Sequence, residues 1–189
     1  MKKRKSSIIN LNKRVLILCE GESEVIYLKG LKTTDENRRR LSAVDIEIYQ
    51  PRNFSPLGLV NEAKKRIREA KSDKLPYFYV WVVFDKDIHA NIPQAMNDAL
   101  TYKIPINIAF SVICFEFWIL LHFEKTTRYF ANCDSLISYI EKKKYISNYS
   151  KTGNLYKLLK GKEDIAIKNS NWCIKQNAPT IRYNNNIHS

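Results

Sequence analysis

Four acidic side chains have the type and spacing to do chemistry. Glu20 ends one short apolar run, and Glu24 lies four residues further on. Asp85 and Asp87 end a second apolar run. Carboxylate oxygens suit Mg²⁺ or Mn²⁺, and one or two such ions serve phosphoryl transfer by activating water and steadying the leaving oxygen. We therefore expect these four acids to bind Mg²⁺ or Mn²⁺ and to hydrolyse phosphodiesters.

The elements that must position these acids alternate between strands and helices. Short segments that are rich in β-branched residues, or in which apolar and polar residues alternate, predict strands. Apolar residues at helical spacing predict helices. The expected strands are Arg14–Cys19, Val44–Tyr49, Tyr77–Phe84 and Ile106–Phe110. The first three expected helices are capped by Ser23, Ser55 and Asn91. The later helices are expected at Phe115–Phe123, Leu136–Lys144, Leu155–Leu159 and Asp164–Gln176. The polar segment Thr33–Arg40 is expected to be a loop. This order predicts an α/β fold, a parallel sheet of about four strands with helices on both faces.

The predicted sheet brings the acids together. Function gathers at the carboxyl ends of the strands in open parallel sheets, where Glu20, Asp85 and Asp87 would lie. Residues two apart in an extended segment point to the same side, so the two aspartates can converge on one ion. The alternative is that the acids cap helices and line loops. We favour the site because E-G-x-S-E after one buried strand, followed by D-x-D after another, is more specific than either motif alone.

The basic residues predict a polyanionic partner. The formal net charge is +13, which suits nucleic acid, although the abundance of Lys, Asn, Ile and Tyr is also typical of proteins from AT-rich genomes. Candidate nucleic-acid contacts are Lys86, Lys143, Lys144 and Lys151, and we select Lys151 as the cation near the scissile phosphate. A solvated surface lysine is the alternative for each. Tyr145 and Tyr149 either stack bases or contribute to packing.

Length and composition bound the organisation of the chain. Its 189 residues predict a basic tail (1–13), a catalytic core (14–130), a helical annex (131–182) and a frayed tail (183–189). No segment approaches the ~20 apolar residues of a membrane span, so we expect a cytoplasmic protein without a membrane partner. The four cysteines form no C-x-x-C, which argues against a zinc knuckle and a disulfide framework, and we expect most of them to contribute to buried packing.

The acidic motifs resemble a TOPRIM domain, the fold shared by primases, topoisomerases and OLD-family nucleases. That fold carries a glutamate after its first strand and D-x-D after its third, matching ILCEGESE at 17–24 and VVFDKD at 82–87. The segment SVICFEFWILLHF at 111–123 resembles the S-N-P-x-F-E-x-W-L-L-L-H-F signature of RloB-like proteins, and NAPT at 177–180 resembles their N-P-x-T. The resemblance implies a TOPRIM nuclease of bacterial anti-phage defence, of the abortive-infection type, that cleaves DNA or an RNA such as tRNA.

The resemblance also implies partners and further site residues. An RloA-like ATPase or a restriction-system component would be the partner, and any ATP dependence must come from it because the chain has no G-x-x-x-x-G-K-[ST] motif. Glu116 is either a further metal ligand, or an orienter of one, or a buried glutamate that caps a helix or pairs with a lysine. His122 is interpreted as a satisfied core histidine.

Two departures from the family pattern keep a second function open. Val112 and Ile113 replace the usual Asn-Pro, and Arg182–Asn186 replaces the usual closing helix. The alternative to a nuclease is therefore a catalytically inactive nucleic-acid-binding or regulatory subunit of a defence complex. The sequence is also compatible with an oligomer.

Overall fold

The computed structural model describes residues 13–86, 91–153 and 155–177. Several sequence predictions lie outside these ranges. They concern Asp87, most of the basic N-terminal tail, the last three residues of the NAPT motif and the C-terminal tail 183–189.

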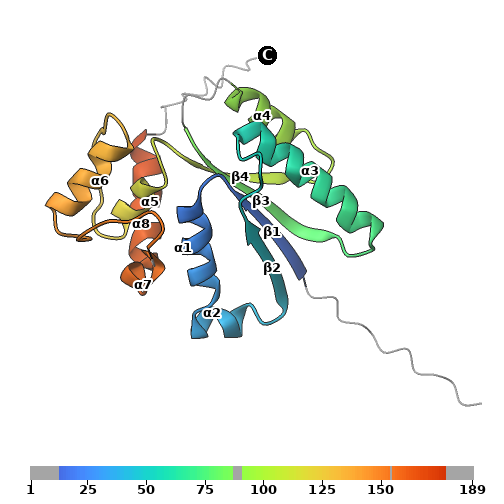
Figure 1. Ribbon diagram of the computed structural model, residues 1–189, viewed down its shortest axis with the longest axis horizontal. Coiled ribbons are helices and arrows are strands. Elements are labelled where there is room, and N and C mark those ends of the chain that lie inside the picture. Colours follow the sequence, from blue (N-terminus) through green and yellow to red (C-terminus); the bar gives the residue numbers. More distant parts are fainter. Residues whose placement is uncertain (1–12, 87–90, 154, 178–189) are drawn as a thin grey trace, which may run out of the picture.

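A four-stranded, all-parallel sheet forms the centre of the fold (Figure 1), as the sequence predicted. Its order is β2-β1-β3-β4, which places β3 between two neighbours. The strands are β1 (Lys13–Cys19), β2 (Val44–Tyr49), β3 (Tyr77–Asp85) and β4 (Ile106–Ser111). Every connection between successive strands contains a helix, as parallel pairing requires, and the architecture is Rossmann-like.

Eight helices occur in the described part of the chain. They are α1 (Glu22–Lys32), α2 (Asp35–Arg40), α3 (Pro56–Ser72), α4 (Ile92–Leu100), α5 (Glu116–Leu121), α6 (Cys133–Lys142), α7 (Leu155–Leu159) and α8 (Glu163–Asn177). Ser55 caps α3 as expected, because its Oγ accepts a hydrogen bond from the Gly58 amide at 3.2 Å. Helix α6 begins three residues before the predicted start, where Asn132 and Ser135 form a capping box.

Two predictions about the first helices were wrong. The segment expected to be a loop contains α2, whose cap is Thr34 and whose Glu36 and Arg40 form an i,i+4 ion pair at 3.3 Å. A short polar helix of this kind has no apolar periodicity to reveal it. Ser23 does not cap α1, because the helix already begins at Glu22 with Gly21 as its N-cap.

The main hydrophobic core lies between the sheet and helices α3 and α4. Alternate side chains of β1 and β3 point into it and are fully buried, whereas those between them face the other side of the sheet. Lys64 of α3 binds Asp98 of α4 at 2.6 Å along this layer. The core side chains of the two strands are Leu16, Leu18, Val80, Val82 and Phe84.

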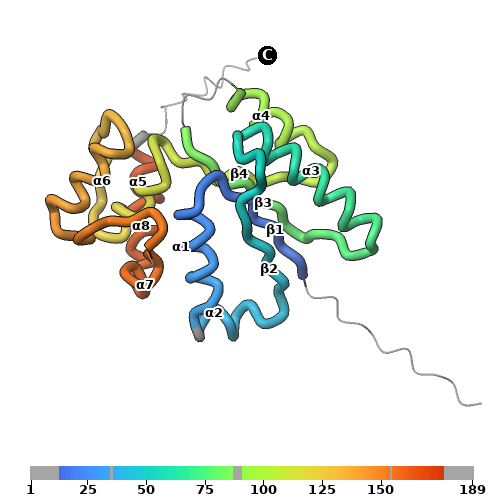
Figure 2. The backbone as a smooth tube through the Cα atoms, in the orientation of Figure 1, coloured from blue at the N-terminus to red at the C-terminus, as the bar shows by residue number. Residues whose placement is uncertain are grey.

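A second core joins α1 to the C-terminal helices. Figures 1 and 2 show α5–α8 together beyond α1, away from α3 and α4. Tyr27 of α1 packs against Phe115, Trp118 and Tyr156 at ring distances of 5.6, 6.4 and 5.6 Å. Helix α1, which follows β1, therefore contacts both the sheet and the C-terminal helices.

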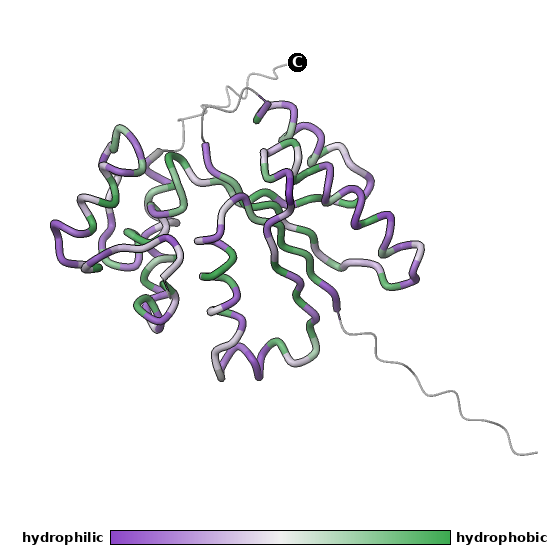
Figure 3. Tube along the Cα trace, in the orientation of Figure 1, coloured by the Kyte–Doolittle hydropathy of each residue, from purple (hydrophilic) through white to green (hydrophobic). Residues whose placement is uncertain are grey.

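Hydropathy follows the layers of the fold. Figure 3 shows hydrophobic residues concentrated in the strands and an almost wholly hydrophilic α2. On the face of β3 that α3 and α4 do not cover, Tyr79 and Trp81 are 53% and 38% exposed. In the described part of the chain, no helix is both long enough and apolar enough to cross a bilayer.

Candidate metal centre

Glu20 and Asp85 meet where the two central strands end. Strands β1 and β3 are parallel neighbours with Cys19 opposite Val83, so the residues that follow emerge at the same edge. The Glu20 amide donates to the Val83 carbonyl at 2.9 Å. In return, the Asp85 amide donates to Oε2 of Glu20 at 2.9 Å. The predicted convergence at the strand ends is therefore present for these two acids.

Glu24 joins them because Gly21 leaves space for its carboxylate. Glu24 lies in the first turn of α1, as expected, and is 3% exposed. A Cβ atom at Gly21 would lie 2.5 Å from Glu24 Oε2, which is too close for real contacts. The glycine of the E-G-x-S-E motif thus lets the Glu24 carboxylate fold back against the turn after β1.

Asp85 has one satisfied oxygen and one that lacks a donor. Its Oδ2 accepts a hydrogen bond from the Phe115 amide at 3.2 Å, which links the site to the start of α5. Among the described residues, Asp85 Oδ1 is a buried side-chain oxygen without any hydrogen-bond partner. Buried polar atoms in folded proteins are almost always paired, and an exception points to strain, to a catalytic role or to a bound water or ion. A carboxylate oxygen within an acidic cluster fits a divalent cation better than a neutral donor.

The acids perturb one another's protonation. Burial raises the pKa of Asp85 to about 7, and the charges of Glu24, Glu20 and Glu116 add to the effect, while the Phe115 amide opposes it. Burial likewise raises the pKa of Glu24 to about 7, with contributions from Glu116 and Glu20. These directions follow from several carboxylates sharing a poorly solvated space, an arrangement that a bound cation relieves.

Glu116 joins the acidic cluster from the start of α5. It is 3% exposed, begins α5, and accepts a hydrogen bond from the Tyr149 hydroxyl at 2.7 Å. The alternative of a lysine partner finds no support among its described contacts, and Cys133 Sγ lies 3.0 Å from its Oε2. Because its charge acts on both Asp85 and Glu24, Glu116 belongs to the same electrostatic unit.

The four candidate lysines occupy different surroundings. Lys151 lies beside the acids, since its charge lowers the pKa of Glu24 and its carbonyl accepts a hydrogen bond from Ser23 Oγ at 3.2 Å. Lys86 directly follows Asp85 and is exposed. Lys143 and Lys144 follow the end of α6, where Lys143 Nζ lies 5.6 Å from the Tyr139 ring, and the structure brings neither to the carboxylates.

Three further sequence interpretations are decided by contacts. His122 is 1% exposed, and its two ring nitrogens lie 3.1 Å from the Tyr27 hydroxyl and 2.9 Å from the Trp118 carbonyl, which confirms a satisfied core histidine. Tyr145 stacks on Phe123 at 4.9 Å, and the Tyr149 hydroxyl binds Glu116. Both tyrosines therefore take part in packing, and each remains partly exposed.

Sequence reasoning missed Gln50 and misjudged two cysteines. The Gln50 side-chain amide donates to the Glu20 carbonyl, and its position directly after β2 is the signal that could have revealed it. Cys114 and Cys133 form a disulfide, whereas Cys19 and Cys173 are free and buried as expected. The sequence argument against a disulfide framework did not reveal this bond, because a separation of 19 residues gives no sign that the fold joins the pair.

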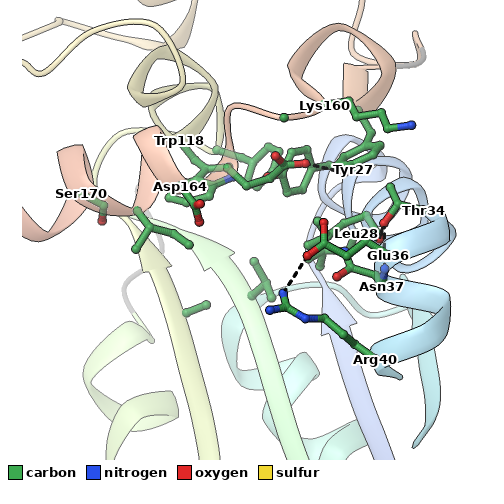
Figure 4. A pocket seen from close by; sticks show the side chains of 18 of the residues that line it. Tyr27, Leu28, Thr34, Glu36, Asn37, Arg40, Trp118, Lys160, Asp164 and Ser170 are labelled. Carbon is green, nitrogen blue, oxygen red and sulfur yellow. Dashed lines mark hydrogen bonds and ion pairs between the residues drawn. The ribbon is translucent and has the colours of Figure 1, made fainter. Parts of the chain in front are cut away.

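A groove of about 1110 Å³ lies next to the acidic cluster. Figure 4 shows residues of its walls, with Tyr27 beside Trp118 and Lys160 on one side and Leu28, Glu36 and Arg40 on the other. Val83, Ser111 and Phe115 also line it; Ser111 is opposite Asp85 in the sheet, and Phe115 binds Asp85. The basic lining residues are Arg39, Arg40 and Lys160, and the acidic ones are Glu36, Glu163 and Asp164.

Comparison with known proteins places the chain in one family. No curated protein and no solved structure matches it. The family model described as "RloB-like protein" matches residues 15–188, nearly the whole chain, including all the acids of the cluster. On the strength of this match and of the ordered acidic motifs, the chain belongs to the RloB-like family.

Proposed function

We propose that this protein is a metal-dependent nuclease that hydrolyses phosphodiester bonds of DNA or RNA with Mg²⁺ or Mn²⁺. The observation that carries the proposal is the donorless Oδ1 of Asp85 inside a cluster with Glu20, Glu24 and Glu116. Several carboxylates gathered in a poorly solvated space are costly without a cation, and the hydrogen bonds that they accept leave Asp85 Oδ1 without a donor.

Each residue of the cluster has a role in this proposal. Glu20 and Asp85, fixed by backbone contacts at the strand ends, would hold one or two ions. The bound ion would supply water activation and neutralise phosphate charge. Glu24, folded back against the turn after β1, would be a further ligand of the ion, and a carboxylate not needed as a ligand would accept the proton of the attacking water. Lys151 would stabilise negative charge on the phosphate.

The surface beside the cluster supports a polynucleotide substrate. The adjacent groove contains three cations and three acids, so net charge within it does not select phosphate. Tyr79 and Trp81 instead expose aromatic rings on the same face of β3 as Val83, which lines the groove. Such rings can stack bases, while the net charge of +13 attracts the polyanion over a longer range.

The biological setting is proposed from the family resemblance. We infer a role in anti-phage defence, with an ATPase partner or a restriction-system component controlling the nuclease. The chain has no phosphate-binding G-x-x-x-x-G-K-[ST] loop, so a nucleotide-dependent step would need that partner.

The test is cleavage by the purified protein. Plasmid DNA and total tRNA are incubated with Mg²⁺, with Mn²⁺ or with EDTA, using wild type, Asp85→Asn and the control Asp98→Asn. Asp98 binds Lys64 between α3 and α4, outside the cluster. We expect metal-dependent cleavage that Asp85→Asn lowers at least 100-fold and Asp98→Asn leaves intact. Absence of cleavage, together with nucleic-acid binding that Asp85→Asn does not change, would instead indicate the binding-subunit function.

A further inference from the structure

The Cys114–Cys133 disulfide joins the segment before α5 to the first residue of α6. The two Cα atoms are 5.9 Å apart, and the residues are separated by 19 positions. Cys114 is buried, whereas Cys133 is only partly buried and sits at the N-terminus of a ten-residue helix. A reductant can therefore reach the Cys133 sulfur more easily than the Cys114 sulfur.

The disulfide adjoins two residues at the start of α5. Phe115 contacts the acidic cluster, and Glu116 belongs to it. Phe115, next to Cys114, donates its amide hydrogen to Asp85 Oδ2 at 3.2 Å. Glu116 follows and acts electrostatically on Asp85 and Glu24. Cys114 is therefore one residue from the Asp85 contact and two residues from Glu116.

The segment before α5 has an unusual backbone that depends on its restraints. Ile113, a β-branched residue, has a φ of 89°. A left-handed conformation of this kind is unfavourable for a bulky side chain and persists only where the surroundings hold it. The covalent bond at the next residue is one of those restraints.

Reduction changes both geometry and hydrogen bonding. Two thiol sulfurs cannot stay at bonding distance, so the segments must separate by on the order of 1 Å. Cys133 Sγ also lies 3.0 Å from Glu116 Oε2. In the disulfide this sulfur carries no proton, but as a thiol it can donate a hydrogen bond to that carboxylate.

We propose that Cys114–Cys133 is a reversible thiol–disulfide modification site that controls the cation affinity of the acidic cluster. The disulfide holds Phe115 against Asp85, and reduction loosens this contact and weakens cation binding. The effect on cation affinity rests on the proposed function, whereas the redox reaction and its effect on Phe115 do not.

The reductant is a dithiol. One thiolate attacks Cys133 Sγ, forming a mixed disulfide and releasing Cys114 as a thiolate that takes up a proton. The second thiol of the reductant, after losing its proton, attacks the mixed disulfide and releases Cys133, which is protonated in turn. Two electrons pass to the protein, and the dithiol becomes a disulfide. Burial raises the pKa of the Cys19 thiol far above its ordinary range, so Cys19 is a poor competitor in this exchange.

The experiment compares oxidised and dithiothreitol-reduced full-length protein by three measurements. Thiols are counted after denaturation, amide exchange of Phe115 is followed by NMR, and Mn²⁺ affinity is measured by electron paramagnetic resonance. We expect two additional thiols on reduction, at least tenfold faster exchange at Phe115 and about tenfold weaker Mn²⁺ binding. Cys133→Ser should resemble the reduced protein in both redox states, and the control Cys173→Ser should respond like wild type.

Several results would overturn the proposal. One is an equal thiol count before and after reduction, and another is a Phe115 exchange rate that reduction does not alter. Stoichiometric zinc that remains with the purified protein and is lost in Cys133→Ser would assign Cys114, Glu116 and Cys133 to a metal site instead, since their ligand atoms lie within 4.8 Å of one another. Absence of Mn²⁺ binding in both forms would overturn the proposed function, and the modification site would then be judged by thiol count and Phe115 exchange alone.

Discussion

Replacing Asp85 with asparagine should stabilise the metal-free protein at alkaline pH. Burial, reinforced by Glu24, raises the pKa of Asp85 from 3.8 to about 7. A carboxyl group whose pKa is higher in the folded than in the unfolded state binds its proton more tightly when folded. Stability therefore falls as the pH rises from about 4 to about 7, and the full cost is present above pH 7. A rise of this size corresponds to at most about 4 kcal/mol.

Asparagine removes the charge and retains an oxygen that can accept the Phe115 hydrogen bond. We expect Asp85→Asn to raise the free energy of unfolding by about 2–4 kcal/mol at pH 8 and by far less at pH 4.5, where wild-type Asp85 is already protonated. The assay is urea unfolding in EDTA, followed by circular dichroism. Charge repulsion elsewhere in the protein affects variant and wild type alike, so it largely cancels in the difference between their free energies of unfolding.

The matched control is Asp98→Asn, which removes the partner of Lys64 at 2.6 Å. This change should lower stability at pH 8 by no more than about 1 kcal/mol, because the pair is partly solvated. The reasoning would be refuted if Asp85→Asn destabilised the metal-free protein at pH 8, or if its effect were the same at pH 4.5 and pH 8.

Three other substitutions test separate parts of the account. Gly21→Ala should displace the flexible Glu24 carboxylate, because the new Cβ would lie 2.5 Å from it. We expect Mn²⁺ affinity, measured by calorimetry, to fall about tenfold while the free energy of unfolding changes by less than about 1 kcal/mol. Unchanged affinity would contradict the role of Gly21. Tyr149→Phe removes the hydroxyl group that donates a hydrogen bond to buried Glu116. We expect the free energy of unfolding, measured in urea, to fall by about 2 kcal/mol. An unaltered unfolding midpoint would show that this hydrogen bond does not stabilise the fold. Trp81→Ala should weaken binding of a single-stranded oligonucleotide about tenfold in fluorescence anisotropy, and equal affinity would remove the open β3 face from the substrate path.

Periodicity in the sequence was sufficient to predict the sheet and part of the site. Two-residue alternation and short β-branched runs are properties of local sequence, and helix-containing connections force the strands into parallel order. Glu20 and Asp85 could be predicted because Glu20 directly follows β1 and Asp85 is the last residue of β3, so the parallel pairing of these neighbouring strands brings them together. Glu24 followed from its place in the first turn of α1.

The remaining features depend on contacts that local sequence does not encode. Helix α2 is held by a cap and an ion pair rather than by an apolar face, so its polar residues suggested a loop. The Cys114–Cys133 bond and the Tyr149–Glu116 hydrogen bond require α5, α6 and the following segment to pack together. Their partners are 19 and 33 residues apart, and such long-range contacts have no periodic signal.

The most direct test of the central claim is a crystal structure of the protein grown with Mn²⁺ near pH 8, with anomalous diffraction used to locate the ion. The account predicts an anomalous peak at about 2.2 Å from Asp85 Oδ1, in contact with a carboxylate oxygen of Glu20 or Glu24. A fully occupied peak elsewhere, or no peak at the acidic cluster at millimolar Mn²⁺, would contradict the assignment of these acids to a metal centre.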